Sequence, residues 1–305
     1  MDTQQTGKSL INGIATLHFI VTRPEGQQQE LIAHLNALNN TPELVTKIPA
    51  INIVHLPLIS IEPHYAEIKR PSFESFTGII FISKNAVKYL KSQLSEKQWD
   101  SLLEKPLYAI GEATANLLRS ELDRLGISDD VVFPNKATSE SLLALNHLKE
   151  IEEENWLIVK GVAGRDKLRT ELINRKAVVS ELVVYKRNKP SNSMEKKIIK
   201  QRQSESKITS VKNDSSIKTI WLISSAEGLK NLSNILNRES QELDSTQGCL
   251  VITTSDRITK VAENLGFTIA AQSNNATDEA LFSCVRNFVC KKFETKSKLN
   301  SDRKT

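Results

Sequence analysis

The sequence contains little cysteine and no long apolar run. Its three cysteines, Cys249, Cys284 and Cys290, are too few and wrongly spaced for a disulfide framework or a zinc site. No apolar stretch approaches the roughly 18 residues needed to span a bilayer, and the first residues lack the cationic region and apolar block of an export signal. We therefore expect free thiols, a reducing cytoplasmic location and no membrane insertion.

The signatures of common nucleotide-binding and hydrolytic enzymes are missing as well. The chain has no G-x-x-x-x-G-K-[ST] loop, and Gly161 and Gly164 are wrongly spaced for a G-x-G-x-x-G fingerprint. It has no G-x-S-x-G elbow, and its five histidines do not follow a metal-ligand spacing. These absences argue against nucleotide chemistry and predict a protein with neither a metal nor an organic cofactor.

The net charge of +5 on the 305-residue chain is unevenly distributed. Residues 286–305 carry seven basic and two acidic side chains, and residues 191–218 carry seven and three. The rest of the chain has a net charge of −4. Because the positive charge lies in peripheral polar segments, we do not expect nucleic acid as a partner. We predict an irregular insertion at 191–216 and disordered termini at 1–15 and 291–305.

Short apolar runs alternate with segments of helical periodicity. The run 79–82 is continuously apolar, as in a strand buried on both faces, whereas Leu31, Leu35 and Leu38 repeat at helical spacing. The pattern predicts an α/β fold with mostly parallel sheets flanked by helices. The expected strands are 18–22, 51–58, 78–83, 107–111, 131–133, 156–160, 178–185, 217–224, 248–253 and 267–271. At about 150 residues per domain, the length predicts two domains.

The sequence also repeats itself. Residues 137–143 match 276–282, and residues 83–94 match 225–236; two further blocks recur in the same order at nearly the same spacing. Blocks that recur in order indicate two structurally similar halves.

Small polar clusters follow most of the predicted strands. Helix N-termini there expose unpaired N–H groups that favour carboxylate or phosphate ligands, and in open α/β sheets ligands bind at this end of the strands. The same residue types are also the usual N-caps, so capping remains an alternative for each cluster. The candidate residues are Thr22, Arg23, Ser83, Lys84, Asn85, Gly111, Thr114, Lys160, Gly161, Arg165, Ser224, Ser225, Ser255, Arg257 and Thr277.

The sequence blocks at these strand–helix junctions, taken in order, resemble those of a known protein family. The blocks include Val21-Thr22-Arg23-Pro24, Phe81-Ile82-Ser83-Lys84-Asn85-Ala86-Val87, Ala109-Ile110-Gly111-Glu112-Ala113-Thr114-Ala115, Val184-Tyr185-Lys186-Arg187 and Ala276-Thr277-Asp278-Glu279-Ala280-Leu281. Together they resemble the uroporphyrinogen-III synthase family over roughly residues 17–289. The resemblance implies two similar domains, 16–58 with 188–290 and 61–184. Crossover strands at 56–61 and 182–187 would form the hinge, with the active cleft between the domains.

The resemblance implies a lyase of haem biosynthesis. Such an enzyme cyclises hydroxymethylbilane to uroporphyrinogen III, with inversion of ring D and loss of water, and uses no cofactor. The candidate residues listed above would bind the substrate carboxylates. Tyr185 would either protonate the departing hydroxyl or serve as a packing residue of the cleft wall.

The resemblance further implies a monomer that receives its substrate by transient handover from hydroxymethylbilane synthase. The residues alone leave another interpretation open. This alternative is a non-enzymatic two-domain α/β module that binds an anionic ligand or has a regulatory role.

Overall fold

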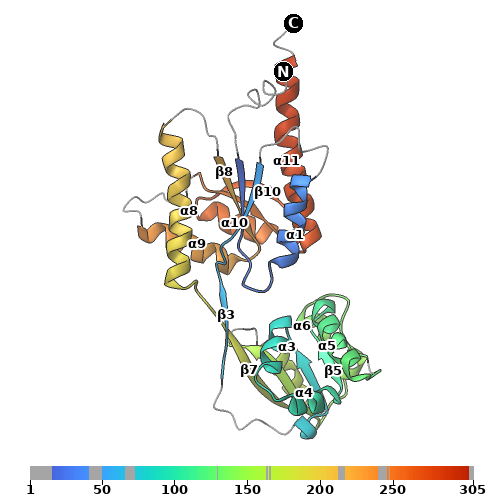
Figure 1. Ribbon diagram of the computed structural model, residues 1–305. Coiled ribbons are helices and arrows are strands. Elements are labelled where there is room, and N and C mark those ends of the chain that lie inside the picture. Colours follow the sequence, from blue (N-terminus) through green and yellow to red (C-terminus); the bar gives the residue numbers. More distant parts are fainter. Residues whose placement is uncertain are drawn as a thin grey trace. The chain divides into compact units, whose positions relative to one another are not determined.

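The computed structural model describes residues 16–40, 50–65, 73–128, 130–162, 164, 166–211, 217–239, 246 and 248–301 (Figure 1). The chain divides into two compact units, one of Met1–Ser60 with Lys189–Thr305 and one of Ile61–Asn188. The first unit (unit 1) is therefore assembled from both ends of the chain, and the second (unit 2) is a continuous insertion.

Unit 1 is built on a five-stranded sheet of order β10-β9-β8-β1-β2. All neighbouring strands pair in parallel, so their carboxyl ends lie at one edge. The strands are β1 (Thr16–Val21), β2 (Ala50–His55), β8 (Ile217–Ile223), β9 (Leu250–Thr253) and β10 (Thr268–Gln272).

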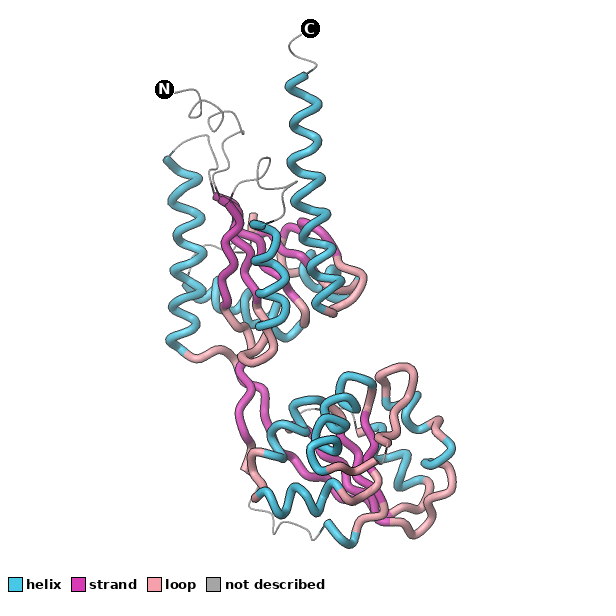
Figure 2. The backbone as a smooth tube through the Cα atoms, turned by 45° about the vertical axis from the view of Figure 1, so that its right-hand side comes forward, coloured by secondary structure: helices cyan, strands magenta, loops and turns pink. Residues whose placement is uncertain are grey.

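Helices cover both faces of this sheet (Figure 2). They are α1 (Gln29–Ala37), α8 (Asn192–Val211), α9 (Ala226–Glu239), α10 (Asp256–Asn264) and α11 (Asp278–Ser301), with a 3-10 turn at Leu38–Asn40. Successive residues of β1 serve opposite faces: Phe19 packs with Leu35 and Val285, whereas Ile20 packs in the cluster on the other face. This explains the continuously apolar strands.

Unit 2 contains a second five-stranded sheet, of order β3-β7-β6-β4-β5. Its strands are β3 (Ser60–Pro63), β4 (Gly78–Phe81), β5 (Leu107–Ala109), β6 (Asn155–Gly161) and β7 (Val178–Asn188). The last four pair in parallel. The side chain of Asn188 donates to Glu62, and His64 N donates to Val184 O, so β3 runs antiparallel to β7.

The helices of unit 2 also lie on both faces of their sheet. They are α3 (Lys84–Lys91), α4 (Glu96–Leu103), α5 (Glu112–Leu125), α6 (Ser139–Leu143) and α7 (Lys167–Asn174), with 3-10 turns at Phe73–Ser75 and Asn146–Leu148. Ile79 and Trp99 belong to one buried cluster, and Ile80 and Leu172 to another. Among the described residues, no helix is long and apolar enough to cross a membrane.

The predicted α/β class, with parallel sheets flanked by helices, is confirmed. Each predicted strand overlaps an observed strand, except 131–133, which forms an isolated parallel bridge from Val132 to Tyr108. The apolar pattern missed β3, whose four residues include Glu62 and Pro63. A short strand of this composition lacks the apolar run on which the prediction depended.

Two predictions of irregular structure were wrong. The segment 191–216 contains helix α8 over Asn192–Val211, and the backbone of the C-terminal segment is helical through Ser301. Neither helix contains glycine or proline, and both are rich in lysine, glutamate and other good helix formers. The fully buried Ile198 also anchors α8 on the core of unit 1. The predicted disordered segment 1–15 lies outside the described residues.

Candidate functional site

The carboxyl edge of the unit 1 sheet gathers seven of the predicted residues. They follow strands β1, β8, β9 and β10, which are parallel neighbours or near neighbours. They are Thr22, Arg23, Ser224, Ser225, Ser255, Arg257 and Thr277. Such an edge is where open α/β sheets bind ligands.

Three of these hydroxyls cap helices. Ser225 Oγ accepts from Gly228 N at 3.0 Å, Ser255 Oγ from Ile258 N at 3.4 Å and Thr277 Oγ1 from Ala280 N at 3.3 Å. The pKa of the Glu279 carboxyl is lowered by hydrogen bonds from its own backbone N–H and from the Thr277 hydroxyl. The capping interpretation therefore holds at these positions, and α11 begins with an ionised carboxylate.

Arg23 is held by the start of α11. Its guanidinium forms an ion pair with Asp278 and donates to Ala276 O at 2.6 Å; both side chains of the pair are 14% exposed. The preceding Thr22 is buried, and its hydroxyl donates to Leu222 O at 2.6 Å. These bonds fix the loop after β1, and any anion bound by Arg23 would have to compete with Asp278.

The carboxyl edge of the unit 2 sheet brings Ser83, Gly161 and Tyr185 together. Ser83 Oγ lies 3.1 Å from the Tyr185 hydroxyl, and it also accepts from Ala86 N at 3.1 Å as the N-cap of α3. Gly161 pairs with Tyr185 across β6 and β7. Ser83 is the N-cap of α3, Gly161 ends β6 and Tyr185 lies within β7, so only the fold makes them neighbours.

Close packing fixes the ring of Tyr185, which is 6% exposed. A Cβ atom on Gly161 would lie 2.7 Å from two atoms of the ring, so this approach requires glycine. The Tyr89 ring stacks on it with centroids 5.8 Å apart, and the Tyr89 hydroxyl donates to Ile61 O at 2.6 Å. Burial, together with the charge of Glu62, raises the pKa of Tyr89, which keeps this neighbouring phenol neutral.

A small pocket of about 160 Å³ lies at the same edge of unit 2. Ile82, Thr138 and Lys160 are among its lining residues. Lys160 is buried and donates to Glu181 at 2.9 Å, with Asp166 at 3.7 Å, so its charge is already balanced. A side chain at Gly111 would place its Cβ 2.6 Å from the Cβ of Ala137, so glycine lets this loop approach.

The remaining predicted residues of unit 2 lie near these junctions. Lys84 is exposed in the first turn of α3, whereas Asn85 and, in the first turn of α5, Thr114 are buried. Arg165 lies outside the described residues. Within the described parts of the chain, no group of three or more histidine, cysteine, aspartate or glutamate side chains could hold a metal ion.

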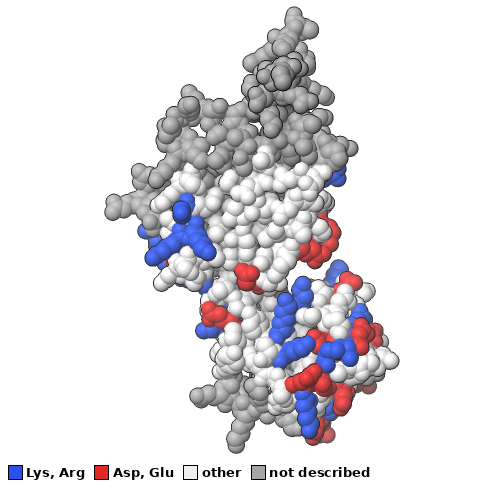
Figure 3. Space-filling model, in the orientation of Figure 1, with Lys and Arg blue, Asp and Glu red and all other residues white. Residues whose placement is uncertain are grey.

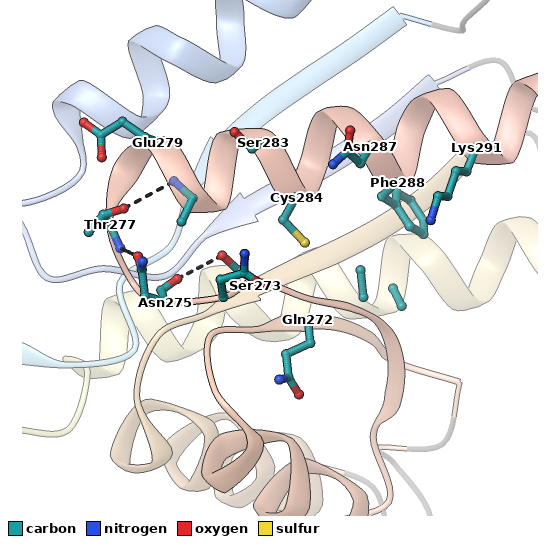
Figure 4. A pocket seen from close by; sticks show the side chains of 14 residues that line it. Gln272, Ser273, Asn275, Thr277, Glu279, Ser283, Cys284, Asn287, Phe288 and Lys291 are labelled. Atoms are coloured by element: carbon teal, nitrogen blue, oxygen red, sulfur yellow. Dashed lines mark hydrogen bonds between the residues drawn. The ribbon is translucent and has the colours of Figure 1, made fainter.

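A larger pocket of about 820 Å³ lies in unit 1 between β10 and α11 (Figure 4). Of the residues predicted to bind the ligand, Thr277 alone lines this pocket, together with Gln272, Asn275, Cys284 and Lys291 among others. Burial raises the pKa of the Cys284 thiol, which disfavours a reactive thiolate. In the sequence, the repeated block 276–282 points to this region. It marks the start of α11 but does not indicate a pocket beside that helix.

Basic and acidic side chains are interspersed on the visible face of unit 2 (Figure 3). Ion pairs of unit 2 include Arg124 with Asp100 at 2.5 Å and Lys91 with Glu121 at 2.7 Å. This face therefore does not present a field of one sign, and an anionic ligand must be bound by local donors.

Comparison with known proteins gives consistent matches. A family model described as "Uroporphyrinogen-III synthase HemD" matches residues 49–283. The uroporphyrinogen-III synthase of Proteus mirabilis is 36% identical over 140 residues, which are 44% of this chain and 67% of that protein. The enzyme of Escherichia coli (strain K12) is 24% identical over 277 residues, covering 88% of this chain and 100% of the relative.

Solved structures share the fold. Uroporphyrinogen-III synthetase from Helicobacter pylori 26695 superimposes with a TM-score of 0.51 at 16% identity, covering 86% of this chain and 95% of that one. A mutant uroporphyrinogen III synthase from the extremely thermophilic bacterium Thermus thermophilus gives a TM-score of 0.51 at 13% identity, with coverages of 92% and 99%. At these identities, the likeness concerns the fold alone.

Proposed function

Since this chain belongs to the uroporphyrinogen-III synthase family, it is an enzyme that forms uroporphyrinogen III, and we propose that hydroxymethylbilane is its substrate. Family membership supports this assignment. The phenol of Tyr185 beside Ser83 is a group that could take part in the reaction. The alternative of a non-enzymatic binding module is not favoured, because the family is defined by an enzyme.

The proposed reaction is a cyclisation with loss of water. The carbon–oxygen bond of the hydroxymethyl group breaks with electrons supplied by the pyrrole nitrogen, and the oxygen leaves as water after taking up a proton. The resulting azafulvene is captured at the substituted position of ring D to give a spiro intermediate, whose fragmentation and recombination invert that ring. Because the linear substrate also cyclises spontaneously without inversion, the enzyme must chiefly hold the reacting ends in the geometry of the spiro bond.

We propose that Tyr185 donates the proton to the departing hydroxyl. A phenol can act as a general acid, and this one has its oxygen fixed at the edge of the sheet by Ser83. The close packing by Gly161 and Tyr89 supports the alternative role of a wall residue equally well. The two roles differ in what the hydroxyl itself contributes, which the Tyr185→Phe variant measures.

We propose that backbone amides and hydroxyls at the helix N-termini bind most of the substrate's carboxylates. The first turns of α3, α9, α10 and α11 lie at the carboxyl edges of the sheets, where a helix N-terminus favours negatively charged ligands. Arg23 and Lys160 are paired with Asp278 and Glu181, so they contribute less than their charges suggest. We also propose that the enzyme is a monomer and takes hydroxymethylbilane directly from its synthase, since direct transfer limits spontaneous cyclisation.

The test is the isomer that the enzyme produces. The full chain is incubated with hydroxymethylbilane, the product is oxidised, and the uroporphyrin isomers are separated by chromatography. We expect the type III isomer, formed faster than the type I isomer appears in a reaction without protein. Type I alone, at the uncatalysed rate, would contradict the assignment.

A further inference from the structure

The hydroxyl of Ser83 has two neighbours with different roles. A serine hydroxyl has one proton to donate and two lone pairs. Ser83 Oγ accepts the backbone N–H of Ala86 at 3.1 Å, which occupies a lone pair and caps α3. The Tyr185 hydroxyl lies 3.1 Å away. With the amide on a lone pair, the serine proton is free to be donated to the phenolic oxygen.

Close packing holds the Tyr185 side chain in one position, so its hydroxyl stays beside Ser83. Gly161 lies against the hydroxyl end of the ring, where even a methyl group would clash at 2.7 Å. The Tyr89 ring stacks on the same side chain, and Gln93 donates to the backbone carbonyl of Val184 at 2.7 Å, which holds the strand beside it. The phenolic oxygen is therefore kept beside Ser83 by contacts on both its ring and its backbone.

We propose that Ser83 is a positioning residue that donates its proton to the Tyr185 oxygen. This arrangement leaves the phenol's own proton for the departing hydroxyl of the substrate. When that proton is transferred, the water leaves and Tyr185 becomes a phenolate, which the Ser83 hydroxyl then stabilises by a charge-assisted hydrogen bond. The inference rests on the proposed function, and it assigns to Ser83 a role through Tyr185 in place of direct contact with a substrate carboxylate.

The test is a double-mutant cycle on type III formation by the full chain. We expect Ser83→Ala to lower kcat about tenfold, the effect of losing one hydrogen bond to a charged group, with KM nearly unchanged. Tyr185→Phe should lower kcat at least as much and still retain a few per cent of activity. In the Tyr185→Phe background, Ser83→Ala should cause no further loss. The inference would be overturned if the two substitutions lowered kcat independently, so that their fold-losses multiply in the double variant. A change confined to KM would also overturn it.

Matched variants separate this role from helix capping. Ser83→Ala also removes the N-cap of α3, so we expect it to lower the urea midpoint of unfolding. Ser95→Ala removes the cap of α4 in the same unit and is expected to lose similar stability with kcat unchanged. Ser83→Asp keeps an acceptor for the cap but has no proton to donate, so it should fold normally and lose kcat, whereas Ser83→Thr should retain most of it. Full activity of Ser83→Asp would contradict the proposal.

The outcomes distinguish the inference from the proposed function. A wild-type chain that makes no type III isomer would end the functional proposal. If the wild-type chain makes the type III isomer but the two substitutions lower kcat independently, only the role of Ser83 would be contradicted.

Discussion

At the scale of single residues, Arg23 shows how a predicted ligand contact can be a structural one. The Arg23 side chain is largely buried and paired with Asp278, 255 positions later in the sequence. Removing one member of such a pair leaves the other charge without its partner in a poorly solvated place. We therefore expect Arg23→Gln to destabilise unit 1 by roughly 2–4 kcal/mol, and the double variant Arg23→Gln/Asp278→Asn to recover part of that loss.

Urea denaturation of the wild type, Arg23→Gln and the double variant measures this effect. Arg257→Gln, which changes an exposed arginine on the neighbouring α10, is the control and should leave the denaturation midpoint unaltered. An Arg23→Gln protein of normal stability but greatly raised KM would instead identify Arg23 as a substrate contact.

His18 provides a test of pH dependence. It lies on the interior strand β1 between Asn52 and Thr219, and its Nδ1 is buried without a hydrogen-bond partner among the described residues. Burial lowers the pKa of His18 below its ordinary value of 6.5. The unfolded chain thus binds a proton near pH 6.5 that the folded chain still excludes. Stability that is present above pH 6.5 is consequently lost as the pH falls below it.

We expect the free energy of unfolding of the wild type to decrease between pH 7.5 and pH 5.5 by more than that of His18→Gln. Urea unfolding at both pH values gives the two differences. His147→Gln, at an exposed position, should behave like the wild type. Equal losses for wild type and His18→Gln would show that His18 titrates alike in both states.

The sequence predicted which residues stand at the strand ends but not which side chains they meet. Thr22 and Ser83 were found because each follows an apolar run directly, and Gly161 because it comes one residue after such a run. Arg23 and Lys160 are paired with Asp278 and Glu181. These two acidic residues come from other elements, so the pairs form only when the sheets assemble. The local pattern therefore predicts which strand ends carry candidate residues, while tertiary packing determines which of their charges are already paired.

At the scale of elements, the junction of β6 with α7 depends on the close approach of β7. Gly161 and Gly164 both lie there, but only Gly161 faces the Tyr185 ring. Gly161→Ala would place a methyl group 2.7 Å from the ring, so the ring must move from the position that places its hydroxyl 3.1 Å from Ser83 Oγ. We expect kcat for type III formation to fall severalfold or more while the protein remains folded.

Gly164→Ala is the matched control for this substitution. Among the residues that the structure describes, its Cβ would meet Lys160 alone, with Cε at an ordinary 3.7 Å, so kcat should stay close to that of the wild type. Equal activities of the two alanine variants would mean that the ring position does not limit the reaction.

Helix α8 marks where element prediction failed. Its polar composition resembles that of an unfolded segment, yet a few residues such as Met194 and Ile198 suffice to hold it against the core. A narrow apolar stripe is easily overlooked when half of the positions are lysine, glutamine or serine. For this segment, the absence of glycine and proline predicts the helix better than the polar composition predicts disorder.

At the scale of the whole molecule, the order of strands in each sheet explains why length alone misplaces the boundary. A cut near residue 150 would separate β6 and β7 from the rest of their sheet. It would also leave β1 and β2 without β8, which pairs with β1. The contacts instead divide the chain at 60/61 and 188/189. Parallel pairing makes this arrangement possible, because neighbouring strands need not be close in sequence.

This topology predicts which fragments fold. Residues 61–188 contain a complete sheet with apolar clusters on both faces, so we expect this fragment to unfold cooperatively in urea and to give a dispersed NMR spectrum. The complementary chain, with residue 60 joined to 189 by a short linker, should also fold, because Ser60 Oγ donates to Lys189 O at 3.3 Å and the ends are adjacent. Fragment 1–150, the matched control, lacks the central strands β6 and β8 and should remain unfolded. A folded 1–150 beside an unfolded 61–188 would show that the repeats, and not these units, fold independently.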